Sequence, residues 1–139
     1  MAACVLDCSV ALSWILPGEA DAPVSAVLDL VAEDGALVPE LWWLETANVL
    51  LMAERRGRIT LAQRVTALTA LKALHITTDR ETTIAAWGAT LDLAAARNLT
   101  VYHAAYLELA LRAGCPLASR DTALIEASRS AGVRTLGHS

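Results

Sequence analysis

The sequence predicts an α/β fold, a three-layer α/β/α domain around a central parallel sheet of about five short strands. Short apolar runs bounded by polar or turn residues are typical of buried strands, and here they alternate with segments whose apolar residues recur at helical spacing. Such alternation favours parallel strands joined by helices that cover both faces of the sheet. A chain of 139 residues can bury a substantial core, so we expect residues 1–139 to form one domain.

The first expected strand, residues 3–6, is a run of small and apolar residues that leads straight into Asp7. Asp7 would then stand at the carboxyl end of the strand, where open α/β sheets place their ligand sites. Ser9 is a candidate N-cap for the helix that follows. Taken alone, Asp7 also fits a turn or a helix cap, so its role depends on what else reaches this edge of the sheet.

The remaining elements follow from capping residues, from glycines and prolines that end helices, and from short apolar runs. Asp21 is a candidate N-cap, and Thr60-x-x-Gln63 and Thr78-x-x-Glu81 have the pattern of capping boxes. Helices are expected over residues 9–16, 22–33, 41–56, 60–73, 78–98, 102–112 and 121–131. Further strands are expected over residues 36–38, 74–77, 116–119 and 133–135.

Composition narrows the class of protein. Hydrophobic residues make up 55% of the chain, yet no apolar run approaches the ~18 residues that a membrane helix needs. No secretory leader is recognisable after Met1. We therefore expect a cytoplasmic protein with no membrane association, whose excess apolar surface is buried in the core or against a partner. Cys4, Cys8 and Cys115 lack zinc-site spacing and are expected to be buried thiols in a reducing compartment.

The net charge of −4 argues against a generic nucleic-acid binder. Lys72 is the only lysine among the 11 basic residues, so the positive charge is almost all arginine, whose planar fork suits phosphate. Arg55, Arg56 and Arg58 cluster, which fits either a phosphate contact or a solvated helix end.

Two more acidic residues are candidates to join Asp7. Glu45 lies in an apolar helical pattern, beside a stripe expected to contain Leu41, Leu44, Asn48 and Leu51. A carboxylate there is costly unless it is paired, bound to a metal or able to reach solvent at the helix edge. Asp121 follows the strand at 116–119 much as Asp7 follows its own, and it also fits an N-cap of the last helix.

Three carboxylates at one sheet edge repel one another unless a divalent cation neutralises them. Hard oxygen ligands suit Mg²⁺ or Mn²⁺. A metal held in this way can generate hydroxide from water and stabilise an in-line displacement at phosphorus.

Four segments together make the chain resemble the PIN-domain ribonucleases, and among them the VapC toxins of bacterial type II toxin–antitoxin pairs. They lie in the family's order at residues 5–11 (VLDCSVA), 38–50 (VPELWWLETANVL), 99–110 (LTVYHAAYLELA) and 116–121 (PLASRD). The resemblance implies a parallel sheet in the order 3-2-1-4-5. It also implies an acidic cluster that binds Mg²⁺ or Mn²⁺, and metal-dependent endonuclease cleavage of RNA.

Position by position, the resemblance implies that Asp7, Glu45 and Asp121 are metal ligands and catalytic residues. The family's other acidic residue, an aspartate directly after a tyrosine, is replaced here by His103. Three interpretations are open: His103 ligates a softer ion such as Mn²⁺, it leaves a weak or inactive nuclease, or it is an introduced inactivating change. Because the site loses at least one negative charge, we expect reduced activity.

The resemblance also implies partners. These are a second copy in a homodimer, a cognate antitoxin bound as a helix or extended tail in a heterotetramer or larger assembly, and an RNA substrate. Arg120, beside Asp121, and Ser9 are the expected substrate contacts. The alternative is a catalytically impaired PIN-fold module that still binds its antitoxin. A response-regulator receiver also clusters acids around Mg²⁺, but it needs a late lysine, and Lys72 is the only one.

Overall fold

The computed structural model describes residues 1–139, and its centre is a five-stranded parallel sheet in the order β3-β2-β1-β4-β5. The middle strand, β1, pairs with β2 through Cys4↔Ala36 and with β4 through Val5↔Leu117. The strands are β1 (Cys4–Leu6), β2 (Ala36–Val38), β3 (Ile76–Thr78), β4 (Leu117–Ala118) and β5 (Thr135–Leu136). The predicted fold class and strand order are therefore confirmed.

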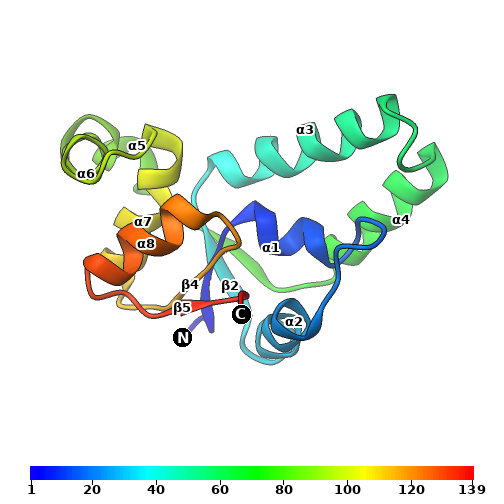
Figure 1. The fold of residues 1–139 in the computed structure, drawn as a ribbon, viewed down its shortest axis with the longest axis horizontal. Helices are drawn as coiled ribbons and strands as arrows, with labels where there is room; N and C mark the ends of the chain where they lie inside the picture. Colours follow the sequence, from blue (N-terminus) through cyan, green and yellow to red (C-terminus); the bar gives the residue numbers. More distant parts are fainter.

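Helices cover both faces of the sheet (Figure 1). The helices α1 to α4 lie on one side and α5 to α8 on the other, and α3 and α4 form a hairpin that reaches away from the sheet. The helical elements are α1 (Cys8–Ser13), α2 (Ala22–Asp34), α3 (Leu41–Arg55), α4 (Leu61–Lys72), α5 (Thr82–Ala85), the π-helical η1 (Ala86–Thr90), α6 (Leu91–Arg97), α7 (Val101–Ala113) and α8 (Thr122–Ser130). None of them is both long enough and apolar enough to cross a membrane.

The core forms around β1 because both of its faces are covered. Cys4, Val5 and Leu6 are fully buried, and Trp42 and Tyr106 are the largest buried side chains around them. Cys4 and Cys115 are buried free thiols, as expected, whereas Cys8 is only half-buried. The central strand is thereby held on all sides, and the residue that follows it is fixed in place.

Several predicted helix starts are confirmed by their hydrogen bonds. The Asp21 carboxylate accepts from the Val24 backbone N–H at 3.2 Å. Thr60 and Gln63 form both bonds of a capping box. Ser9, in contrast, is not an N-cap: β1 ends at Leu6 and α1 begins at Cys8, so Asp7 occupies the N-cap position and Ser9 is already helical.

The expected capping box at Thr78 and the single helix over 78–98 are wrong. Thr78 is the last residue of β3, where it pairs with Val38, and Glu81 precedes α5 without a side-chain cap. The helical segment is then divided into α5, η1 and α6, because Gly88 adopts φ −113° and ψ −108°, outside the helical region.

The buried face of α3 also differs from the expected stripe. Trp42, Thr46, Leu50 and Ala53 are the buried residues, whereas Leu44 is 77% exposed and Asn48 is exposed. The face is rotated because burying the large Trp42 ring removes more apolar area from water than burying Leu44. Glu45 consequently lies at the edge of the buried face and is half-buried.

Candidate metal and active site

Asp7 stands at the carboxyl end of β1 and is the most buried of the predicted site residues, with 3% of its surface exposed. Its Oδ2 accepts hydrogen bonds from the Ser9 hydroxyl at 2.6 Å and from the Ser119 hydroxyl at 2.8 Å. Its Oδ1 accepts none from the protein. One carboxylate oxygen is thus fixed by the protein, and the other is left for a ligand.

The two serine hydroxyls also bind the loop between β4 and α8. Ser9 Oγ accepts from the Arg120 backbone N–H at 3.0 Å, and Ser119 Oγ accepts from the Asp121 backbone N–H at 3.0 Å. Each serine oxygen accepts a backbone N–H from the loop, and each hydroxyl donates its single proton to Asp7. Sequence reasoning missed Ser119, although its position at the end of a strand, two residues before Asp121, was a usable signal.

Burial raises the pKa of the Asp7 carboxyl above its ordinary value. The hydrogen bonds from Ser9 and Ser119 lower this pKa, as does the nearby charge of His103, whereas the negative charge of Asp121 raises it further. A buried carboxylate with a raised pKa is more readily ionised when a cation is bound beside it.

Glu45, in the second turn of α3, accepts a hydrogen bond from the hydroxyl of Tyr106 on α7. Burial raises the pKa of the Glu45 carboxyl, the bond from Tyr106 lowers it, and the charge of Asp7 raises it. Burial also raises the pKa of Tyr106, so this phenol keeps its proton and acts as the donor. Tyr106 was missed from the sequence; its place three residues after His103, one turn along α7, was the available signal.

Asp121 and His103 meet at the same edge of the sheet. Asp121 is the N-cap of α8, where its Oδ1 accepts from the Leu124 N–H at 2.9 Å. His103 lies in the first turn of α7, and its Nδ1 is 3.8 Å from Asp121 Oδ1. Asp121 therefore caps its helix and also lies at the carboxyl edge, so the two interpretations of this residue are compatible.

The structure brings all four predicted catalytic residues into one region. The pKa of Asp7 responds to the charges of His103 and Asp121, and the pKa of Glu45 responds to Asp7 and His103. No three His, Cys, Asp or Glu side chains are arranged at metal-binding distances in this structure. The donor chemistry nevertheless fits a divalent cation, since Asp7, Glu45 and Asp121 supply three carboxylates and Oδ1 of Asp7 has no protein partner.

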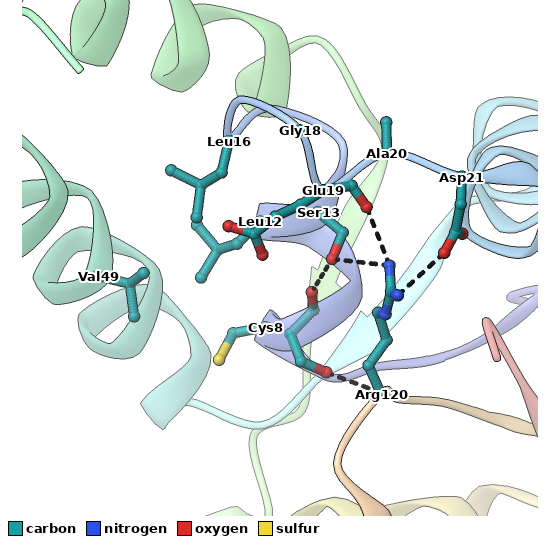
Figure 2. Close-up of a pocket in the computed structure, with 11 residues that line it drawn as sticks. Cys8, Leu12, Ser13, Leu16, Gly18, Glu19, Ala20, Asp21, Val49 and Arg120 are labelled. Carbon is teal, nitrogen blue, oxygen red and sulfur yellow. Dashed lines mark hydrogen bonds and ion pairs between the residues drawn. The ribbon is translucent and has the colours of Figure 1, made fainter. Parts of the chain in front are cut away.

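A cleft of about 550 Å³ opens beside Asp7, along α1 and α3. Figure 2 shows Val49 on one side and Arg120 on the other, with Cys8, Leu12 and Ser13 of α1 between them. The Arg120 guanidinium pairs with Asp21 Oδ2 at 2.9 Å and donates to the Glu19 backbone carbonyl at 3.0 Å. Arg120, which was predicted to contact substrate, therefore forms one wall of the cleft.

Comparisons with known proteins agree with this architecture. The family model described as PIN domain matches residues 4–130. Among solved structures, the chain is similar to PAE2754 from Pyrobaculum aerophilum, with 22% sequence identity and a TM-score of 0.67 over 94% of this chain and 81% of that chain. The search of curated proteins gave no match. At such low identity the structural likeness establishes the fold alone.

Proposed function

This chain belongs to the PIN-domain family, and we propose on that premise that it is a metal-dependent endoribonuclease and the toxin of a VapC-type toxin–antitoxin pair. PIN domains are generally a nuclease fold. The observation that carries the proposal is the Asp7 carboxylate, which is buried at the carboxyl edge of the sheet with one oxygen bound by two serines and the other without a protein partner.

Asp7, Glu45 and Asp121 would hold the cation, Mg²⁺ or Mn²⁺. Such a cation, when bound, supplies hydroxide for attack at phosphorus and stabilises the in-line displacement. Ser9 and Ser119 keep Asp7 oriented, and Tyr106 keeps Glu45 oriented, because each donates a proton to a carboxylate oxygen. Preorganised ligands of this kind lower the cost of assembling a metal site.

His103 is the residue that we expect to limit this activity. It stands 3.8 Å from Asp121, where the family has a carboxylate, so the site has at least one negative charge fewer. This position also supports the second candidate function, a PIN-fold binding module with impaired catalysis that still binds its antitoxin. Activity of the natural chain distinguishes the two.

The proposed partners are a cognate antitoxin, an RNA substrate contacted by Arg120 and Ser9, and a second copy of the chain. Large apolar side chains are exposed on α5, η1, α6 and the start of α7, which contact one another, and we take them together as one exposed apolar patch that supports a protein interface. The patch consists of Ile84, Trp87, Leu91, Val101 and Tyr102, which are 79%, 91%, 47%, 40% and 68% exposed. Exposed apolar surface of this kind marks interaction sites in soluble proteins.

The test of the proposed function is cleavage of single-stranded RNA by the purified chain in Mg²⁺, in Mn²⁺ and in EDTA. We expect internal cleavage with either metal, none in EDTA, and none in the variant Asp7→Asn. Asp29→Asn, which removes an exposed carboxylate from α2, is the matched control and should cleave like the natural chain. Cleavage that persists in EDTA or in Asp7→Asn would contradict the proposal.

A further inference from the structure

The cleft beside Asp7 has one apolar wall and one polar rim. Leu12 of α1, Leu16 in the turn that follows α1, and Val49 of α3 supply the apolar surface. Its volume of about 550 Å³ lies within the range of roughly 300–1,000 Å³ typical of sites for small organic groups. Such a wall suits the flat face of an unstacked nucleobase, because bases that leave a helix are held by apolar and stacking contacts.

The cleft adjoins the candidate metal site through Ser9, which lines the cleft and donates a hydrogen bond to Asp7. Cys8 and Ser9, the first two residues of α1, line the cleft and directly follow Asp7 in the chain. Arg120 lines it from the other side and directly precedes Asp121. A base seated here would therefore belong to a nucleotide next to the phosphate that lies at the carboxylates.

The rim offers both hydrogen-bond donors and an acceptor. Arg120 is held in place by Asp21 and the Glu19 carbonyl, and its Nε–H makes no hydrogen bond within the protein. The Glu19 side chain pairs through Oε2 with Arg58 at 3.0 Å, while its Oε1 has no hydrogen-bond partner. A guanidinium held by the protein and an exposed carboxylate paired with Arg58 thus lie on one cleft.

We propose that this cleft binds an unpaired guanine of the RNA beside the scissile phosphate. A carboxylate accepts hydrogen bonds only, and guanine alone presents two adjacent donors, N1–H and N2–H, on its Watson–Crick edge. Guanine also carries the O6 and N7 acceptors that arginine recognises. The Glu19 carboxylate would accept hydrogen bonds from N1–H and N2–H, and the Arg120 guanidinium would donate to O6 and N7.

The overall charge of the chain favours such a local subsite. With a net charge of −4, the protein has little of the general electrostatic attraction that most nucleic-acid binders use. Local contacts are then the favoured source of RNA recognition. This inference rests on the proposed ribonuclease function, of which it would supply the sequence preference.

The test is an NMR titration of the ¹⁵N-labelled full chain with each of the four nucleoside 5′-monophosphates, in EDTA. We expect the amide signals of Leu12, Leu16 and Val49 to shift, and GMP to bind about tenfold or more tightly than AMP, CMP or UMP. Shifts confined to Arg120 and Asp121, with equal affinity for all four nucleotides, would show phosphate binding alone and overturn the proposal.

Two matched pairs of variants locate the binding. Val49→Trp fills the cleft and should weaken GMP binding about tenfold or more, whereas Ala47→Trp adds the same ring to the exposed side of α3 and should not. Glu19→Gln should abolish the preference for GMP. Glu54→Gln also removes a carboxylate paired with an arginine, but away from the cleft, and should keep the preference.

The proposed function and the guanine subsite can fail separately. A preference for GMP in a chain that cleaves no RNA would support the subsite and contradict the nuclease. An active nuclease that shows no preference for GMP, and whose cleft signals do not move, would overturn the subsite alone.

Discussion

The hydroxyl of Ser119 donates a 2.8 Å hydrogen bond to Oδ2 of Asp7, which lies 112 residues earlier in the chain. The same hydroxyl accepts the backbone N–H of Asp121. One buried serine therefore joins the ends of β1 and β4 and fixes the relative position of two carboxylates that we assign to the metal site.

Replacing Ser119 by alanine tests this role. The variant Ser119→Ala leaves the buried Asp7 with one hydroxyl donor instead of two, so its pKa should rise further. A hydrogen bond to a charged group contributes about 1.5–3 kcal/mol, so we expect Mn²⁺ binding to weaken about tenfold or more in calorimetric titration.

Ser128 provides the control for this experiment. It is also fully buried, but its hydroxyl has no hydrogen-bond partner. Ser128→Ala should therefore leave Mn²⁺ affinity unchanged and should not destabilise the fold. If Ser119→Ala binds Mn²⁺ as tightly as Ser128→Ala, the hydroxyl does not position Asp7.

Restoring a carboxylate at position 103 should strengthen the site. In His103→Asp we expect Mg²⁺ to bind about tenfold more tightly and RNA cleavage to increase, because a hard oxygen ligand replaces an imidazole next to Asp121. His75→Asp adds the same charge at the opposite edge of the sheet, before β3, and should change neither quantity. Equal cleavage by the natural chain and His103→Asp would refute the idea of a weakened site.

A second charged cluster joins the loop after β3 to α7 and should matter for stability. Arg112 on α7 pairs with Asp79 at 2.8 Å and with Glu108 at 2.8 Å, and both carboxylates are buried. Removing the arginine leaves both buried carboxylates without their cation, although Asp79 still accepts from the Thr82 hydroxyl. Arg112→Met should therefore lower the free energy of unfolding by about 3 kcal/mol. Arg64→Met, which breaks the Arg64–Glu54 pair at an equally exposed arginine, should cost less than about 1 kcal/mol.

The difference in unfolding free energy between the natural chain and Arg112→Met should depend on pH in one direction. The hydrogen bonds from Arg112 hold the pKa of Asp79 below its ordinary value of 3.8. The unfolded chain then binds the Asp79 proton more readily, so this contribution to stability is complete above about pH 3.8 and is lost as the pH falls below it. Denaturant unfolding at pH 7 and pH 3 should show the gap between natural chain and Arg112→Met narrowing in acid. A gap that stays constant or widens would contradict the assignment.

Self-association should depend on the exposed apolar patch. We expect the natural chain to be a dimer in light scattering, and Trp87→Glu to be a monomer, because a charge in the centre of a buried interface is costly. Leu30→Glu, at a 41% exposed position on α2, should remain a dimer. A natural chain that is monomeric, or a Trp87→Glu variant that stays dimeric, would exclude the patch as the interface.

The fold was predictable from the sequence where residues close together in the chain determine the local structure. The Thr60 capping box formed because its partners lie within four residues. Thr78-x-x-Glu81 has the same pattern but no box, since pairing of Thr78 with Val38 in the sheet takes precedence. The face of α3 was misassigned for a similar reason, because the burial of Trp42 depends on contacts that the helical pattern does not contain.

The candidate site was predictable only in outline. The carboxyl ends of β1 and β4 share one edge of the sheet, so Asp7 and Asp121 were expected near each other. The roles of Ser119 and Tyr106 depend on contacts across 112 and 61 residues, which no local pattern encodes. The metal-ligand assignment of Asp7, Glu45 and Asp121 remains a prediction.

The most direct test of that assignment is anomalous diffraction at the manganese edge from crystals of the full chain soaked in Mn²⁺. The account predicts a manganese peak at coordination distance from Asp7 Oδ1, with Asp121 or Glu45 as a further ligand, and no such peak in crystals of Asp7→Asn. A peak elsewhere on the molecule, or one that survives in Asp7→Asn, would contradict it.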